Sequence, residues 1–481
     1  MHIREGAELL ADIYWQEANS VAPGQRAPHV WAVLEPSALG PAINVGGNIG
    51  APENHLKIRA IFNALHASYP DYRRQLDVTL VEPKLGILNI LGIPKAVLDP
   101  EFAAESFVSF ERANVYWDTI RLQEDMPFDT KKVLRSENGD KPHVGVAAEE
   151  LAYNPNLKLH FVQGHVTELL ESVARVQIGK LDKGRLPERY RPTKPAEEVE
   201  IPYDSVIIAS GRTRNWPLDP LSSTAEELKK EMADSTAQIK SARKTVIIGG
   251  GALGIELAGE IKHQFPEKEV VLVHPHATLP PESLLCDRFK QQVLEFLENL
   301  GVEVLLGTRI KSEQEDGVLV TTDGRTITSD LTFWCNYKKN NVDFLAKNHP
   351  NVFAPNGDIL VTHQYEVKTD KNEVIGNIFA VGDLADLPLV KTAGWAYREG
   401  CQAGNNAVEL VLNKDRGGYE SVDKEFLDKG GMLLVVGMDQ SVCEDFLGQI
   451  YINDPEHLKM YEDYRLSSMF PTYGLTKEES E

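Results

Sequence analysis

The sequence has few cysteines, and none of them lie close together. Only four occur in 481 residues, at Cys286, Cys335, Cys401 and Cys443, and no C-x-x-C or comparable pair is present. The spacing therefore supports neither a redox-active disulfide of adjacent cysteines nor a cysteine-built zinc site, and we expect no metal centre. So low a cysteine content is typical of a protein kept in a reducing cytoplasm, where we expect this chain to act.

Long apolar runs are also missing. No stretch approaches the roughly 18 consecutive apolar residues of a membrane helix. The first 19 residues contain acids and lack a long apolar core, which is unlike a secretory signal or a basic transit peptide. His2 stands where N-myristoylation needs glycine. We therefore expect at most a peripheral contact with membranes.

The chain also has fewer basic than acidic residues. The chain has 50 Lys and Arg against 72 Asp and Glu, for a net charge of −22. This balance argues against nucleic acid or an anionic membrane as the main partner. An apolar content of 42% and a charged content of 25% are typical of a soluble globular protein, and the length fits two or three domains.

The clearest pattern that is present runs from Lys244 to His274. A β-branched run at residues 244–248 precedes three glycines in G-x-G-x-x-G spacing, and a helical face and a second buried strand follow. The glycines are Gly249, Gly251 and Gly254. In dinucleotide-binding folds they make the tight turn, let the backbone approach a pyrophosphate, and let helix pack on strand. The helix N-terminus then favours the anionic phosphates, so we predict a dinucleotide site here.

A second, eroded unit of this kind is predicted within residues 29–100. Residues 77–81 form a buried strand that ends at Glu82, whose carboxylate suits the hydroxyls of an adenosine ribose. We favour a strand at 42–45 before the glycine turn, whose glycines are Gly46, Gly47 and Gly50. An alternative strand at 30–34 is followed by Glu35, which would bring a carboxylate toward the phosphates. A βαβ unit retained for packing, with weakened cofactor binding, is a further interpretation.

Two more predicted strands end in small residues. Residues 203–211 read as a strand ending at Ser210 and Gly211, and residues 377–386 read as a strand ending at Gly382 and Asp383. A helix predicted from Lys391 to residue 410 carries small residues that allow close approach to a sheet. A strand at 432–436 and a polar, aromatic tail close the chain.

Taken in order, these segments resemble the flavoproteins with two dinucleotide-binding domains, in the pyridine nucleotide-disulfide oxidoreductase superfamily. The chain looks most like their apoptosis-inducing-factor-like and ferroptosis-suppressor-like subgroup in its fungal form. The resemblance covers roughly residues 40–440 and is most specific at VIIGGGALGIELAGEI, NIFAVGDLADLPLVKTAGWA and YDSVIIASG. It implies an α/β, glutathione-reductase-like fold with two Rossmann-like domains.

The domain limits that follow from this resemblance place one domain inside the other. An FAD domain, residues 29–240 and 337–410, is expected to be interrupted by an NAD(P)H domain at residues 241–336. An N-terminal extension, residues 1–28, and a C-terminal α+β segment, residues 411–481, complete the chain. A C-terminal interface makes a homodimer a reasonable expectation.

The resemblance also implies roles for individual residues. Gly249, Gly251 and Gly254 would hold the pyrophosphate of NAD(P)H, and Glu256 would lie near its nicotinamide. Asp383 would bind the ribitol or pyrophosphate of FAD, with room left by Gly382. The remaining expected FAD contacts are Lys391 near the isoalloxazine, Glu82 at the ribose, Val166 at the adenine, and the strand end at Ser210 and Gly211. Lys391 and Glu256 are the expected catalytic residues.

Three positions depart from the family pattern. His274 stands at the strand end where a strictly NAD-dependent site has an acid, so no carboxylate there repels a 2′-phosphate. Both NADH and NADPH therefore stay candidate cofactors. A surface histidine capping the strand is the alternative interpretation. Tyr337 replaces a family glycine, and Ser210 replaces a threonine.

The predicted function is an FAD-dependent oxidoreductase. NAD(P)H would reduce the flavin, and the flavin would pass electrons directly to a quinone-like or other small organic acceptor. The eroded first turn and Tyr337 favour a different hypothesis, a redox-neutral enzyme of specialised metabolism built on the same fold. A non-enzymatic signalling role is a third hypothesis, but the acidic composition argues against DNA binding in such a role.

Overall fold

The computed structural model describes most of the chain between residues 29 and 467. The described ranges are 29–33, 76–109, 119–121, 157–178, 198–315, 317–336, 339–413, 417–422, 424 and 426–467. Several predictions fall outside them: the N-terminal extension of residues 1–28, the glycine turn of Gly46, Gly47 and Gly50, and Tyr337.

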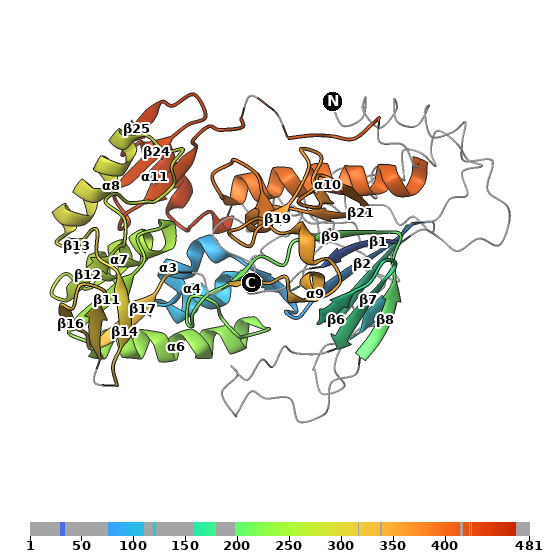
Figure 1. The fold of residues 1–481 in the computed structure, drawn as a ribbon. Helices are drawn as coiled ribbons and strands as arrows, with labels where there is room; N and C mark the ends of the chain where they lie inside the picture. The colour runs from blue at the N-terminus through green and yellow to red at the C-terminus, as the bar shows by residue number, and fades with distance from the viewer. Residues whose placement is uncertain are drawn as a thin grey trace.

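The larger of two main sheets has nine strands (Figure 1). Its order is β20 (Glu366–Lys368), β21 (Val374–Ala380), β9 (Ser205–Ile208), β1 (His29–Val33), β2 (Leu76–Glu82), β6 (Leu157–Leu169), β7 (Val173–Ile178) and β8 (Glu198–Pro202), with β5 (Thr119–Arg121) beside β6. The central strands β21, β9, β1, β2 and β6 are parallel. Strands β20, β7 and β8 add antiparallel pairs at the two sides.

The central strands have the composition of a sheet covered on both faces. All four residues of β9 are buried, as expected where helices cover a parallel sheet. Helix α10 (Ala393–Asn413) lies along one face, against β9, β1 and β21 (Figure 1). The segment after β2 forms β3 (Gly86–Leu88), α3 (Ile93–Ala96), α4 (Pro100–Glu105) and β4 (Phe107–Ser109), and α4 packs against α6 (Ala225–Ser241).

The position of β1 differs from the strand that we favoured. His29 pairs with Asp77 of β2, and Val30 pairs with Ser205 of β9, so residues 29–33 fill the centre of the sheet. This position in the sheet is filled by the strand of the alternative interpretation, at residues 30–34, whereas residues 42–45 lie outside the described residues. Both segments are short and apolar, and only pairing with distant strands separates them.

The smaller main sheet is built by the chain between β9 and β21. Its parallel strands have the order β13 (Glu303–Leu305), β12 (Glu269–Val273), β11 (Lys244–Ile248) and β17 (Leu331–Trp334). Helices α7 (Ala252–Gln264) and α8 (Asp287–Leu300) connect its strands. An antiparallel sheet of β14 (Ile310–Glu313), β15 (Val318–Thr321) and β16 (Thr326–Thr328) packs on it. The predicted strand–turn–helix–strand unit is confirmed.

The chain leaves the nine-stranded sheet after β9 and returns to it at β21. These two strands pair directly, although the whole four-stranded sheet lies between them in sequence. The α/β fold class with two Rossmann-like units is therefore confirmed. The exact domain limits at residues 240 and 336 stay predictions.

The C-terminal segment forms a small antiparallel sheet beside the four-stranded one (Figure 1). It consists of β23 (Met432–Val435), β24 (Ser441–Glu444) and β25 (Ile450–Ile452), followed by α11 (Pro455–Tyr461). Helix α7 approaches it so closely that a Cβ on Gly259 would lie 2.5 Å from the backbone nitrogen of Gly437. Glycine at 259 is thus required for this packing.

Several short elements complete the described fold. Strand β10 (Arg212–Thr213) pairs with β18 (Lys339–Asn340), β19 (Ile359–Leu360) pairs with β22 (Ala385–Asp386), and α9 (Asp343–Ala346) is one helical turn. None of the helices in the described ranges combines the length and apolar composition needed to cross a lipid bilayer.

Candidate functional site

One cavity of about 1170 Å³ lies where the two main sheets and the C-terminal segment meet. Its lining comes from the turn between β11 and α7, the end of β21, the start of α10, and the segment around β23 and β24. Six of the predicted site residues line it: Gly249, Gly251, Glu256, His274, Asp383 and Lys391. The structure thus brings the predicted nicotinamide residues and two predicted flavin residues into one cavity.

The glycine turn has the geometry that its spacing predicted. Gly249 has φ +119°, which side chains rarely adopt, and a Cβ on Gly254 would lie 1.9 Å from the carbonyl oxygen of Gly249. A Cβ on Gly251, the N-cap of α7, would meet no atom within 4 Å. The N-terminus of α7 therefore opens into the cavity, where its free N–H groups and dipole favour an anion.

His274 braces this turn from the end of β12. Its Nδ1 accepts a hydrogen bond from the backbone N–H of Gly250 at 3.0 Å. A neutral imidazole that accepts at Nδ1 carries its proton on Nε2. Burial, helped by the nearby His276, lowers the pKa of His274 to about 4, so the ring is neutral at physiological pH.

Glu256 lines the cavity from the second turn of α7. Its side chain is 5% exposed. Burial, helped by the charge of Glu260 one turn further on, raises the pKa of Glu256 to about 8, despite a hydrogen bond from the backbone of Val435. The carboxyl is therefore mostly protonated at pH 7, and it can donate a proton or a hydrogen bond inside the cavity.

Gly382 and Asp383 lie at the other end of the cavity, directly after β21. The N–H of Val381 donates to the carbonyl of Ile208, which places this turn beside the end of β9. Gly382 has φ +74°. Asp383 is 3% exposed, and its Oδ1 is buried without a hydrogen-bond partner among the described residues. A buried carboxylate oxygen of this kind requires a donor, such as a ligand hydroxyl.

Two arginines surround Asp383, and sequence reasoning missed both. Arg212 donates from Nη2 to the Asp383 carbonyl and to Asp358 Oδ1, each at 2.7 Å. Arg214 lies with a guanidinium nitrogen 3.7 Å from Asp383 Oδ2, and burial lowers its pKa. Both line the cavity. Their position directly after Ser210 and Gly211 was the available signal, because that strand end was already a predicted site.

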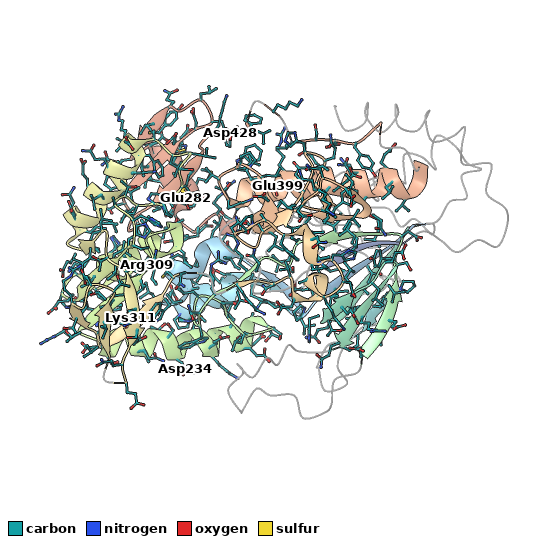
Figure 2. All side chains as sticks on the ribbon, viewed as in Figure 1. Asp234, Glu282, Arg309, Lys311, Glu399 and Asp428 are labelled. Atoms are coloured by element: carbon teal, nitrogen blue, oxygen red, sulfur yellow. The ribbon has the colours of Figure 1, made fainter. Side chains whose placement is uncertain are left out.

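Lys391 lies just before α10, and the first half of that helix supplies a buried acid that the sequence did not reveal. Lys391 donates from Nζ to the carbonyl of Ala385 and lines the cavity. Glu399 projects from α10 (Figure 2). It is 1% exposed and accepts a hydrogen bond from the N–H of Gly382 at 2.6 Å. Burial raises the pKa of Glu399 to about 7, although the nearby Lys391 opposes the shift.

Ser210 and Gly211 lie next to the cavity but form contacts within the protein. Ser210 donates from Oγ to the carbonyl of Asn341 at 2.6 Å, and the Asn341 side chain donates back to the Ser210 carbonyl at 3.0 Å. Gly211 has φ +56° and accepts from the N–H of Asn341. These bonds fix the chain where it returns from the four-stranded sheet.

Glu82 and Val166 are not part of the cavity lining. They lie toward the carboxyl ends of the neighbouring strands β2 and β6, where Glu82 pairs with Gln163. Glu82 is buried, and its Oε1 accepts from the N–H of Lys84 at 2.9 Å. Val166 is buried in the main core. Their expected contacts with a ribose and an adenine stay predictions, as do those of Gly46, Gly47 and Gly50.

A family model, described as "Pyridine nucleotide-disulphide oxidoreductase", matches residues 71–408. The chain belongs to this family. The predicted resemblance is confirmed at this level. The match includes every strand of the two main sheets except β1, with the glycine turn and the Gly382–Asp383 turn inside it.

The chain is also similar in sequence to two curated proteins. Human ferroptosis suppressor protein 1 is 32% identical over 44% of this chain and 57% of its own length. The FAD-dependent oxidoreductase FVFD30 of Flammulina velutipes is 29% identical over 46% of this chain and 69% of its own length. The match to the human protein thus spans little more than half of that relative.

A solved structure shares the fold. The water-forming NADH oxidase of Lactobacillus brevis, bound to NADH, matches with a TM-score of 0.50 and 15% sequence identity. The match covers 87% of this chain and 75% of that enzyme.

Proposed function

We propose that this chain is an FAD-dependent NAD(P)H oxidoreductase, and that it passes electrons through the flavin to a small organic acceptor. The observation that carries the proposal is the single cavity that joins the glycine turn of α7 to Asp383 and Lys391. A hydride donor and a flavin must meet face to face, and a shared cavity satisfies that need. The name of the relative FVFD30 and the family description agree with this chemistry.

The proposed nicotinamide side lies at the four-stranded sheet. The open N-terminus of α7 at Gly251 would hold the pyrophosphate, because free N–H groups and the helix dipole attract an anion. Glu256 lies one turn deeper in the same cavity. A protonated carboxyl there can donate a hydrogen bond to a carboxamide, and it adds no negative charge beside an incoming hydride.

The proposed flavin side lies at the end of β21, and the residues present fit FAD. The buried Oδ1 of Asp383 has no partner among the described residues and suits a ribityl hydroxyl. Arg214 and Lys391 add positive charge to the same part of the cavity, where it stabilises an anion. Bound FAD would supply the capacity to accept a hydride and to release its two electrons to an acceptor.

We propose that no disulfide takes part. Cys335 and Cys443 line the cavity, but burial raises the pKa of Cys335 to about 12 and that of Cys443 to about 11. Thiols with such pKa values stay protonated at pH 7 and are poor nucleophiles. Both are free thiols in the described structure. Electrons therefore go directly from the flavin to the acceptor.

The proposed acceptor is quinone-like. The C-terminal segment contributes four apolar side chains to the cavity, Met432, Leu433, Phe446 and Met460, beside polar lining residues that include Glu444, Asp445 and Arg465. The apolar side chains suit the ring of a small organic acceptor. The balance is one hydride from NAD(P)H and one proton from the surroundings, which together convert a quinone to a quinol.

The test is the visible absorption spectrum of the purified protein, followed by anaerobic addition of NADPH or NADH. We expect a flavin band that bleaches, and its recovery when a short-chain quinone is added. Asp383→Ala should lose the flavin band while the protein stays folded by circular dichroism, and Asp370→Ala, on a surface turn, should keep it. A colourless wild-type protein that FAD cannot reconstitute would refute the proposal. A yellow protein that does not bleach would indicate a redox-neutral enzyme.

A further inference from the structure

The cavity has a distinct rim where β12 and β13 end. Two backbone hydrogen bonds join the segments after these strands: Gly307 N–H donates to the His276 carbonyl, and Thr308 N–H donates to the His274 carbonyl, each at 2.9 Å. This pairing places Arg309 next to both histidines. All of these residues except Gly307 line the cavity.

The lining residues that the ends of β12 and β13 contribute to this rim are His274, Pro275, His276, Thr308, Arg309 and Ile310, and none of these six carries a carboxylate. Further along the segment after β12, Glu282 also lines the cavity, and burial raises its pKa, which favours its neutral form. In dinucleotide-binding folds, an acid at this strand end holds the ribose hydroxyls of NAD and repels the 2′-phosphate of NADP. Here the corresponding position is occupied by an imidazole that already binds the Gly250 N–H.

His274 adds no charge to the rim, so the positive charge comes from its neighbours. Arg309 is exposed, and its guanidinium has no ion pair or hydrogen bond with any described residue. Its backbone is nevertheless held, because the Arg309 carbonyl accepts from Thr322 N–H at 2.9 Å. The nearby Arg325 is already paired with Asp323 and Thr308. An unpaired guanidinium on a cavity wall suits a bidentate contact with a phosphate.

His276 is the second group on this rim that can face an anion. It is exposed, and its ring lies edge-on to His274 with the centroids 5.2 Å apart. Its two ring nitrogens offer a hydrogen-bond donor to a phosphate in either protonation state. Arg309 and His276 therefore flank the neutral His274 with groups that attract a phosphate.

We propose that this rim binds the 2′-phosphate of NADPH, with Arg309 as the main specificity-determining residue and His276 beside it. The inference rests on the proposed nicotinamide site and specifies which nicotinamide that site takes. His274 contributes by holding the glycine turn while leaving the strand end free of negative charge. The chain then discriminates against NADH because the guanidinium loses its partner.

Nucleotide fragments test this inference without the flavin. Calorimetric titration of the full-length protein with adenosine 2′,5′-bisphosphate and with 5′-AMP compares ligands that differ only in the 2′-phosphate. We expect the bisphosphate to bind at least about tenfold more tightly, as a charge-assisted contact to arginine implies. Equal affinities, or tighter binding of 5′-AMP, would overturn the inference.

Two matched pairs of variants locate the effect. Arg309→Ala should remove the preference for the bisphosphate, whereas Lys311→Ala, which deletes the same charge from an exposed position off the lining, should keep it (Figure 2). His274→Asn retains an acceptor for the Gly250 N–H and should keep the preference. His274→Asp differs from it by one negative charge and should reverse the preference. If Arg309→Ala and Lys311→Ala lost the preference for the bisphosphate equally, the effect would be one of overall charge, and the assignment to Arg309 would be overturned.

The two proposals fail in different ways. If both NADH and NADPH bleach the flavin with equal affinity and the two fragments bind equally, the oxidoreductase stands and the specificity inference falls. If neither fragment binds and neither nicotinamide bleaches the flavin, the proposed function falls and takes the specificity inference with it.

Discussion

The carboxylate of Glu399 accepts a hydrogen bond from the backbone N–H of Gly382 at 2.6 Å. This bond ties helix α10 to the turn after β21, directly before Asp383. The same carboxylate lies near Lys391, whose charge favours its ionised form. One buried acid thus connects the two residues that we assign to the flavin side of the cavity.

Removing this acid should weaken flavin binding. Glu399→Ala leaves the Gly382 N–H buried without its acceptor, which costs about 1–3 kcal/mol and frees the turn that positions Asp383. We expect the dissociation constant for FAD, measured by fluorescence titration of the deflavinated protein, to rise about tenfold or more. Glu399→Gln keeps an acceptor oxygen and should stay close to wild type. A Gln variant as weak as the Ala variant would show that charge, and not the hydrogen bond, positions the turn.

The pKa of Glu256 should make stability depend on pH. The folded protein holds this proton up to about pH 8, whereas an unfolded glutamate releases it near its ordinary value of 4.5. The free energy of unfolding contributed by this group therefore falls as pH rises from about 4.5 to 8. Glu256→Gln removes this pH dependence. The free energy of unfolding of the variant, measured with urea, should therefore rise relative to that of wild type between pH 5 and pH 8, by on the order of 3 kcal/mol.

A surface glutamate provides the control for that measurement. Glu298→Gln, on the exposed face of α8, makes the same chemical change. Its free energy of unfolding should change with pH in the same way as that of wild type. If the free energy of unfolding of Glu256→Gln also changed with pH as that of wild type does, the carboxyl of Glu256 would be ionised in the folded state.

Two glycines of the turn should respond differently to alanine. In Gly254→Ala the new Cβ would lie 1.9 Å from the Gly249 carbonyl oxygen, so the turn must open and the melting temperature should fall by several degrees. In Gly251→Ala the Cβ meets no atom within 4 Å, so the fold should survive while nucleotide binding weakens. Thermal unfolding and nucleotide titration of both variants separate these effects. A stable Gly254→Ala would contradict the close packing of turn and helix.

Tyr464 should contribute to the attachment of the C-terminal segment. Its hydroxyl donates to Glu260 Oε1 on α7 at 2.5 Å, and its carbonyl accepts from the side chain of Asn89 at 3.0 Å. Tyr464→Phe leaves the buried Glu260 without this donor, and we expect a loss of about 1–3 kcal/mol in urea unfolding. Tyr451→Phe, on the more exposed β25, should cost less. Equal losses would argue against a special role for the contact with Glu260.

Sequence patterns predicted the parts of the site that depend on local geometry. The glycine turn between β11 and α7 was found because Gly249 and Gly254 satisfy a fixed steric requirement that any chain making this turn must meet. The Gly382–Asp383 turn was found because a buried strand ends there in small residues. In both cases the signal and the structure lie within a few residues of each other.

The missed residues depend on contacts between distant segments. Glu399 looks like an ordinary polar residue of a helix, and its burial follows from the packing of α10 on the sheet. Arg212 gains its role from Asp358 and the Asp383 carbonyl, far along the chain. The central strand was misplaced for the same reason, because pairing with β2 and β9 decides between two short apolar segments.

The return of the chain to its first sheet has a consequence for synthesis on the ribosome. Strand β21 pairs with β9 and carries the turn of Asp383, so the flavin side of the cavity cannot form until about residue 400 has emerged with Glu399. The four-stranded sheet, β11 to β17, is complete by residue 334, and among the described strands its members pair only with one another. The nascent protein is therefore expected to fold its nucleotide-binding unit first and to become able to bind FAD only after residue 400 has emerged.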